Sequence, residues 1–173
     1  IVSEQGLVIT NHHCSFGMIQ AHSSLEHNYL RDGFWAQSMA DELINPKITA
    51  SILVRMEDVT DKINAGLNAG MSESERTKKV NEICRKLESE AVKGTNLAAN
   101  IKPYFNGNQY FLSVFKIFRD VRLVGAPNSA IGKFGGDTDN WTWPRHTGDF
   151  SVLRIYAGPD NEPAAISDKN VPY

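Results

Sequence analysis

The chain has 173 residues, of which 41% are hydrophobic and 22% are charged, so it can form an ordinary globular core, and overall disorder is excluded. Its formal net charge of −2, without a long run of Lys or Arg, argues against a nucleic-acid or anionic-membrane partner. No stretch approaches the roughly 20 apolar residues that cross a bilayer, so we expect no membrane span.

The first predicted elements are strands. Residues 1–10 contain the apolar run Leu7–Ile9, and the polar cluster Asn11–His13 ends this strand with a turn. Residues 24–40 follow an irregular pattern with part-helical character. Residues 47–56 then alternate between apolar and polar side chains, which predicts a half-buried strand. The apolar face of that strand consists of Ile48, Ala50, Ile52, Val54 and Met56.

The middle of the chain is predicted to be helical. The clearest helix begins at Ser72, because its hydroxyl can cap the first turn while Glu75 reaches back to it. Gly94 is a suitable C-terminal stop. A shorter helix is expected from Val59 to Leu67, so that residues 58–94 form a helical hairpin. Helical spacing gives the longer helix one apolar stripe, which consists of Val80, Ile83, Cys84, Leu87 and Ala91.

The remaining residues return to β patterns. Residues 106–108 are predicted to form the turn between 101–105 and the aromatic run 110–124. A polar, Gly-rich loop follows, and residues 149–156 then predict a strand with an acid at its start. We expect residues 1–157 to form one portion of a domain, and residues 158–173 to be a linker or the start of the next segment. The expected fold class is mainly β with a helical insertion.

Two segments carry candidate catalytic residues. His13 follows an apolar strand and directly precedes Cys14, where an imidazole is held firmly enough to act as a general base. Such a base needs a carboxylate behind it to set its tautomer. Asp149, which opens an apolar strand, is the first choice, because Asp137 and Asp139 have neighbours typical of turns. A histidine followed later by an aspartate is the chain order of the chymotrypsin triad.

The third member of such a triad, a serine in a glycine-rich turn, is missing. Ser129 and Ser151 lack glycine flanks, and no G-x-S-x-G motif indicates an α/β-hydrolase. The chain opens within strand-like residues and ends at Tyr173 without a clear boundary. We therefore expect it to be the N-terminal part of a longer protein that carries the serine further along, and to be inactive alone.

The segments ITNHHCSFG and GGDTDNWTWPRHTGDFS resemble those of bacterial serine dipeptidyl-peptidases typified by dipeptidyl-peptidases 7 and 11, in the chymotrypsin-like clan. The resemblance implies part of a double β-barrel catalytic domain, incomplete here, with a large helical domain inserted later. It implies that His13 is the general base and Asp149 its orienting acid. It further implies that Asn140 and Trp141 hold the substrate's terminal ammonium, since an amide oxygen can accept from it and an indole face can attract it.

The same resemblance implies an exopeptidase that releases dipeptides from peptides with a free N-terminus. It also implies a homodimer at full length and a periplasmic or cell-surface location, while no cofactor is expected. The side chain preferred beside the scissile bond is either hydrophobic or acidic, with a slight preference for the hydrophobic type.

Other interpretations of these residues stay open. A noncatalytic binding module on a trypsin-like scaffold would also lack the nucleophile. Trp141 and Trp143 could instead fill the base of a loop, as buried aromatic side chains often do. Cys14 and Cys84 permit one disulfide at most, or two separate thiols.

No metal site is expected. The histidines at positions 12, 13, 22 and 27 lack a recognisable ligand spacing such as H-E-x-x-H. His12 and His13 must point in different directions on extended backbone, so only one of them can face the acid. We choose His13, because a His-Cys pair is also found in trypsin-like enzymes.

Overall fold

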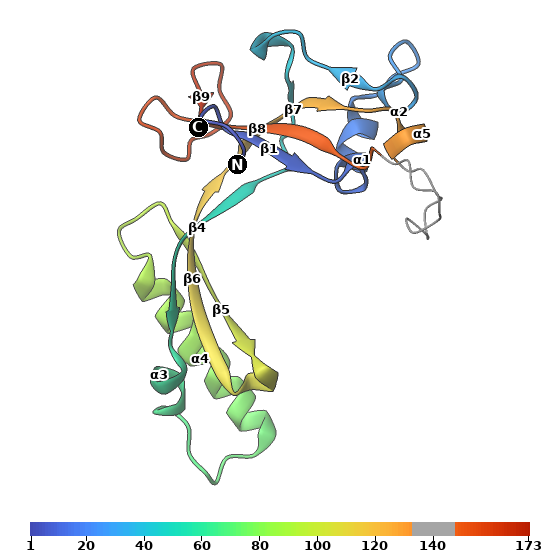
Figure 1. Cartoon of the computed structure of the whole chain (residues 1–173). Coiled ribbons are helices and arrows are strands. Elements are labelled where there is room, and N and C mark those ends of the chain that lie inside the picture. Colours follow the sequence, from blue (N-terminus) through green and yellow to red (C-terminus); the bar gives the residue numbers. More distant parts are fainter. Residues whose placement is uncertain (133–147) are drawn as a thin grey trace. The chain divides into compact units, whose positions relative to one another are not determined.

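The computed structural model describes residues 1–132 and 148–173. It divides into two compact units (Figure 1). Unit 1 consists of Ile1–Ala50 and Phe118–Tyr173, and unit 2 consists of Ser51–Ile117. Unit 2 is therefore a single insertion between the two halves of unit 1, and every described candidate catalytic residue lies in unit 1.

Unit 1 is built on an antiparallel sheet. Its main path has the order β1-β8-β7-β2, while β3 pairs with β7 and β9 with β8. The strands are β1 (Leu7–Thr10), β2 (Phe34–Trp35), β3 (Leu43–Ile44), β7 (Asp120–Ala126), β8 (Ser151–Ala157) and β9 (Val171–Pro172). The helices are α1 (His12–His22), α2 (Tyr29–Asp32), η1 (Met39–Asp41) and α5 (Ser129–Gly132). The buried core consists of Ile19, Val121, Leu123, Ala126 and Leu153.

The predicted turn at Asn11–His13 is wrong in form, because the chain continues directly into helix α1. The strand does end there, but His12, Ser15 and Ile19 follow at helical spacing and are all buried. Two of these three side chains are polar, so the buried face of α1 has no apolar periodicity to reveal it. Helix α1 is therefore evident from the structure and not from the sequence pattern.

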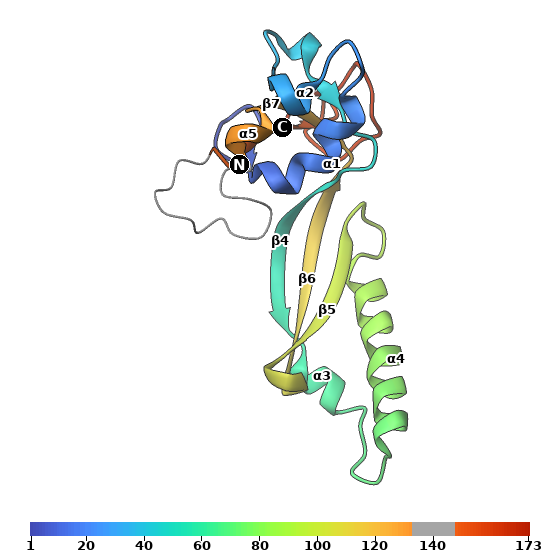
Figure 2. The ribbon, with the colours of Figure 1, turned by 90° about the vertical axis from the view of Figure 1, so that its right-hand side faces the viewer.

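Unit 2 is a three-stranded sheet with a long helix. The strand order is β4-β6-β5, and α4 packs beside β5 (Figure 2). Its elements are β4 (Ala50–Asp58), α3 (Thr60–Asn64), α4 (Glu73–Ala91), β5 (Ala98–Tyr104), η2 (Phe105–Gly107) and β6 (Gln109–Phe118). The turn predicted at residues 106–108 is confirmed, since η2 joins β5 to β6 and Asn106 adopts a φ of 56°.

The long helix predicted in unit 2 is confirmed, whereas the shorter helix expected from Val59 to Leu67 covers only Thr60–Asn64. Ser72 caps α4, and its capping box with Glu75 is complete in both directions. The predicted stripe of α4 packs on a buried cluster that includes Val59, Ile63 and Leu112. The capping box and the apolar stripe are local features, which is why the sequence alone could predict this helix.

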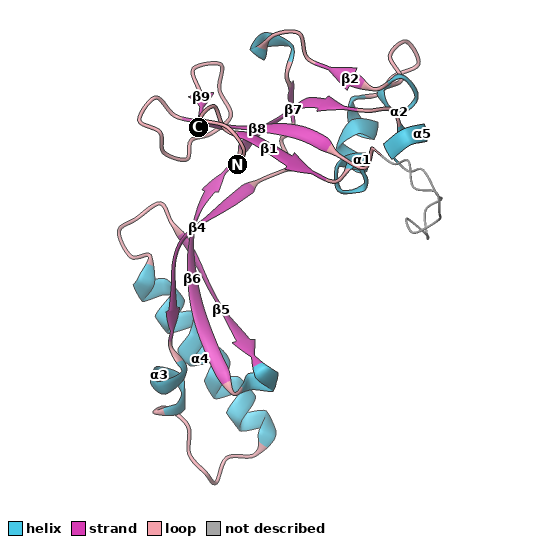
Figure 3. Ribbon diagram, in the orientation of Figure 1, coloured by secondary structure: helices cyan, strands magenta, loops and turns pink. Residues whose placement is uncertain are grey.

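The aromatic run 110–124 is not one strand. Its first part lies in β6 of unit 2, and its second part lies in β7 of unit 1. Both units also contain helices, so the fold is mixed α/β instead of mainly β (Figure 3). Within residues 1–132 and 148–173 the sheets are open, and no closed barrel is seen.

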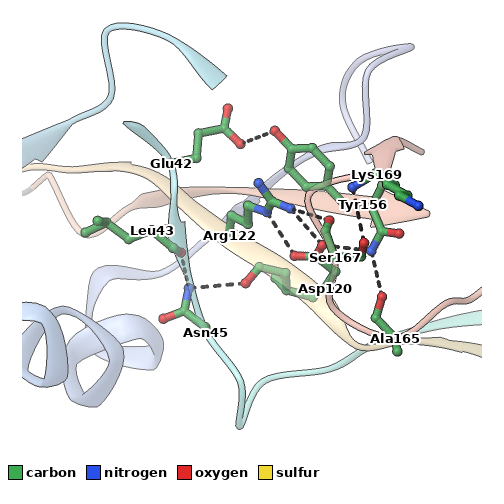
Figure 4. Close-up of polar contacts among 11 residues, drawn as sticks. Glu42, Leu43, Asn45, Asp120, Arg122, Tyr156, Ala165, Ser167 and Lys169 are labelled. Atoms are coloured by element: carbon green, nitrogen blue, oxygen red, sulfur yellow. Dashed lines mark hydrogen bonds and ion pairs between the residues drawn. The ribbon is translucent and has the colours of Figure 1, made fainter. Parts of the chain in front are cut away.

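A network of buried ion pairs and hydrogen bonds connects strands in the sheet of unit 1; Figure 4 shows part of it. Glu42 accepts from Arg154 Nε and from the Tyr156 hydroxyl, each at 2.8 Å. Arg122 donates twice to Asp120, at 2.9 and 2.8 Å. The Arg122 guanidinium also lies 3.9 Å from the centre of the Tyr156 ring. These groups therefore link two neighbouring strands, β7 and β8, to the residue that precedes β3.

The network shifts the ionisation of its members. Burial and the bond to Glu42 raise the pKa of Tyr156 to about 12. Burial also pushes the pKa of Asp120 upward, but hydrogen bonds from Arg122 and Asn170 outweigh it and lower that pKa below its ordinary value. At neutral pH the hydroxyl is therefore a donor and the carboxylate is charged.

Residues 158–173 lie within unit 1. Strand β9 pairs with β8, and the Asn170 side chain donates to Asp120 Oδ2 at 2.9 Å. The expected linker thus contributes contacts to the same sheet and to the ionic network. No helix among the described residues is long and apolar enough to cross a membrane.

Candidate active site

The sheet topology brings two distant segments to one edge. Strands β1 and β8 are antiparallel, with Thr10 opposite Ser151. The residues just after β1 and those just before β8 must therefore lie at the same end of the strand pair. This register places the start of α1 next to Asp149, although the two are separated by more than half of the chain.

The two neighbouring histidines point in different directions, as predicted, although on a helix. His12 is completely buried, and its Nε2 lies 3.1 Å from the Ser129 hydroxyl oxygen. The His13 side chain is 54% exposed. Of the two, only the His13 side chain is thus exposed to solvent, while His12 connects α1 to α5.

His13 is paired with Asp149 at this edge. Its ring Nδ1 lies 2.7 Å from Asp149 Oδ2, and its backbone N–H donates to Oδ1 at 3.0 Å. The side-chain amide of Asn11 also donates to Oδ2, at 2.9 Å. The Asp149 side chain is only 10% exposed. One carboxylate therefore holds the first turn of α1 and the imidazole that the turn carries.

Asp149 is charged at neutral pH. Partial burial raises its pKa, but the hydrogen bonds from Asn11 and from the backbone and ring of His13 outweigh burial and leave the pKa of Asp149 below its ordinary value. Helix α1 has no acidic residue in its first turn. The Asp149 carboxylate supplies negative charge at this helix N-terminus, where it is favourable.

The pair is arranged for proton transfer. A carboxylate at Nδ1 fixes the tautomer that carries its proton there and leaves Nε2 as the basic nitrogen. Among residues 1–132 and 148–173, no hydrogen bond to Nε2 of His13 is formed. An exposed Nε2 in this tautomer can accept a proton from a hydroxyl group supplied by another segment.

The serines of the described segments do not complete a triad with His13. The Ser129 hydroxyl lies against His12. The Ser151 side chain is fully buried within β8. Neither hydroxyl is hydrogen-bonded to Nε2 of His13.

The predicted substrate residues Asn140 and Trp141 lie outside the described residues, as do Trp143 and the alternative acids Asp137 and Asp139. The described residues on either side of this segment are close together, because Gly148 N–H donates to the Ile131 carbonyl at 2.9 Å. The described residue that follows this segment, Gly148, directly precedes Asp149 in the chain.

The other candidate ligands are not gathered into a site. In the described part of the chain, no group of three or more His, Cys, Asp or Glu side chains could hold a metal ion. Nε2 of His22 lies 3.0 Å from Asn45 Oδ1, and His27 stacks on Tyr29. The two cysteines are free thiols. The sequence indicates Asn11 only as the end of a strand; its contact with Asp149 depends on the pairing of β1 and β8, which no local pattern reveals.

Comparisons with known proteins give one consistent result. The family model described as Peptidase S46 matches residues 1–173. Dipeptidyl-peptidase 7 of Porphyromonas gingivalis is 49% identical over 99% of this chain and 24% of its own length. An Asp/Glu-specific dipeptidyl-peptidase of Flavobacterium psychrophilum is 50% identical over 100% of this chain and 24% of its own length.

A solved structure agrees in fold. The crystal structure of Porphyromonas endodontalis DPP11 in complex with substrate matches 99% of this chain and 26% of its own chain, with 45% identity and a TM-score of 0.87. The chain thus spans about a quarter of the length of the relatives that it matches.

Proposed function

The chain belongs to the peptidase S46 family, and from this membership we propose that it is the part of a serine-type dipeptidyl-peptidase that supplies the general base and its orienting acid. The observation that carries the proposal is the 2.7 Å contact between His13 Nδ1 and Asp149 Oδ2. His13 is the base and Asp149 the acid that orients it. The nucleophilic serine lies outside these 173 residues.

The proposed reaction begins with proton transfer. Nε2 of His13 takes the proton of the serine hydroxyl as the oxygen attacks the peptide carbonyl, and later returns it to the leaving amine. Asp149 stabilises the imidazolium that forms in between, because its carboxylate is charged and already bonded to Nδ1. In this proposal the open sheet of unit 1 is part of a chymotrypsin-like double barrel, which the rest of the protein completes.

The proposed substrates are peptides with a free N-terminus. Asn140 and Trp141 would bind the terminal ammonium, the first through its amide oxygen and the second through its indole face. Gly148, the first described residue after their segment, directly precedes Asp149 and donates to the Ile131 carbonyl. In this proposal, binding of the terminal ammonium by Asn140 and Trp141 limits the product to a dipeptide.

The relatives do not favour one specificity. The identity to dipeptidyl-peptidase 7 is 49% and that to the Asp/Glu-specific enzyme is 50%. We propose that residues near the missing serine choose between a hydrophobic and an acidic side chain. A homodimer and a periplasmic or cell-surface location are likewise proposals for the full-length protein.

The proposal is tested on the full-length protein with a small panel of chromogenic dipeptidyl substrates, each with a free or an acetylated N-terminus. We expect release from the free substrates and almost none from their blocked partners, because acetylation removes the ammonium. The hydrophobic and the acidic members of the panel identify the preferred side chain.

Equal cleavage of blocked and free substrates would contradict the exopeptidase assignment. Tight binding of free peptides without any turnover, in a full-length protein that has no serine in a G-x-S-G turn, would instead support the noncatalytic binding module.

A further inference from the structure

We propose that Asn11 is a positioning residue, whose side-chain amide holds the Asp149 carboxylate in the orientation that His13 needs. This inference rests on the proposed function, because it concerns the same pair. The observation behind it is the 2.9 Å hydrogen bond from Asn11 Nδ2 to Asp149 Oδ2.

The bond from Asn11 completes a three-donor arrangement around the carboxylate. The backbone N–H of His13 donates to Oδ1, while the His13 ring and the Asn11 amide both bond to Oδ2. The bond from the His13 ring is lost if the imidazole turns, whereas the bonds from the His13 backbone N–H to Oδ1 and from Asn11 to Oδ2 stay in place. Of these two, only the Asn11 bond holds Oδ2, the oxygen that faces the imidazole, and it keeps that oxygen oriented when the ring moves during proton transfer.

Asn11 has no other structural task among the described residues. It is the N-cap residue of α1, where an Asn side chain ordinarily accepts from a backbone N–H. Here it makes no such cap bond. The side chain is exposed to solvent, so it does not fill the core. Its amide group points at Asp149 instead, which indicates a role in the site and not in helix capping.

The expected effect of losing Asn11 is on the rate of chemistry. Asn11 does not contact the basic nitrogen of His13, so it acts through Asp149. Loss of a hydrogen-bond partner that orients a metal ligand typically costs about 10- to 100-fold in affinity or activity, and Asn11 supports Asp149 in an analogous way. We expect kcat of the full-length protein to fall about 10-fold in Asn11→Leu, with KM nearly unchanged. The melting temperature should stay close to that of the wild type.

A matched variant distinguishes a side chain that positions Asp149 by donating a hydrogen bond from one that only fills space. Asn11→Asp has the same shape as the native residue but places a carboxylate against the Asp149 oxygens. It should lose more kcat than Asn11→Leu at neutral pH, since like charges repel and the donor is gone. Asn11→Gln, which keeps the amide on an exposed side chain, should recover part of the rate. A residue that only fills space would give the opposite order for the first two variants.

A double-mutant cycle with Asp149→Asn tests the path of the effect. In that background, the further change Asn11→Leu should lower kcat by less than twofold, because the group that it positions has already been altered. An equal loss in both backgrounds would overturn the inference, as would wild-type kcat in Asn11→Leu.

The two proposals fail in different ways. If His13→Ala keeps full turnover, the proposed function itself is wrong. If His13→Ala abolishes turnover while Asn11→Leu and Asn11→Asp keep wild-type kcat, only the role of Asn11 is wrong.

Discussion

Unit 1 carries two charged clusters on one sheet, and they differ in how their hydrogen-bonding groups are used. In the buried network, the Asp120 and Glu42 side chains are 0% and 2% exposed, and each is bonded to an arginine; Figure 4 shows the pair of Asp120 and Arg122. At the start of β8, Asp149 is almost as buried at 10%, yet its partner His13 is 54% exposed.

The difference shows what distinguishes a candidate site from a structural ion pair. The pKa values of Asp120 and Asp149 are both lowered, and each carboxylate is held by several hydrogen-bond donors. A lowered pKa therefore does not separate the two clusters. The arginine partners Arg122 and Arg154 are only 11% and 9% exposed, whereas His13 combines one bonded nitrogen with a ring that is 54% exposed. We infer that the first cluster holds the sheet together and the second is free to react.

The largest expected effect is the loss of activity on removal of the His13 imidazole. In the full-length protein, His13→Ala should reduce kcat/KM by about 10⁴-fold or more, because removal of the base of a serine triad costs that much. The melting temperature should change little, since the side chain is half exposed. Steady-state kinetics and thermal unfolding measure the two effects. Asn81 is an exposed residue of α4 in unit 2, and Asn81→Ala is a control that should alter neither quantity.

The second prediction is a loss of stability with little loss of activity. Asp120→Ala leaves the Arg122 guanidinium buried without its carboxylate, and loss of one partner of a buried pair typically costs about 3–5 kcal/mol of unfolding free energy. We expect a large drop in the melting temperature. Protein that still folds at low temperature should retain kcat within a few-fold, because Asp120 is not part of the His13 site. A variant with normal stability would contradict the structural role of the network.

The Asp120 contribution should also depend on pH. Its carboxyl has a lowered pKa in the folded protein, so the stabilisation is present above the unfolded pKa and is lost as pH falls through the folded pKa. The wild type should therefore lose more stability on acidification than Asp120→Ala does. Melting temperatures between neutral and acidic pH, measured in parallel, test this sign.

The smallest effect sharpens the comparison within the network. Tyr156→Phe removes the 2.8 Å bond to Glu42 while Glu42 keeps its arginine, so the loss should be about 2 kcal/mol, the size of a hydrogen bond to a charged group. Chemical unfolding measures it, and the variant should be less destabilised than Asp120→Ala. Equal destabilisation by both changes would show that the hydroxyl matters as much as the ion pair.

Local features of the sequence predicted the parts of the structure that depend on neighbouring residues. The capping box at Ser72 and Glu75 and the apolar stripe of α4 belong to one helix, so its start and its buried face could be inferred without the rest of the chain. The strand before Asn11 and the strand after Asp149 were also predicted, since each is a short apolar run.

Long-range pairing was predicted only in part. The chain order of His13 and Asp149, together with their flanking motifs, indicated that they form a pair, and the two groups do lie in contact. Their catalytic roles stay predictions. The roles of Asn140 and Trp141 also stay predictions, because both residues lie outside the described segments.

By itself the sequence determined the family, the helix of unit 2 and the residue types at the candidate site, because motifs and periodicity are written in consecutive residues. Only the tertiary structure decided that α1 begins at His12, that the run 110–124 is shared by two sheets, and that Asn11 reaches Asp149. The physical reason is register: pairing Thr10 with Ser151 aligns side chains that no local pattern connects.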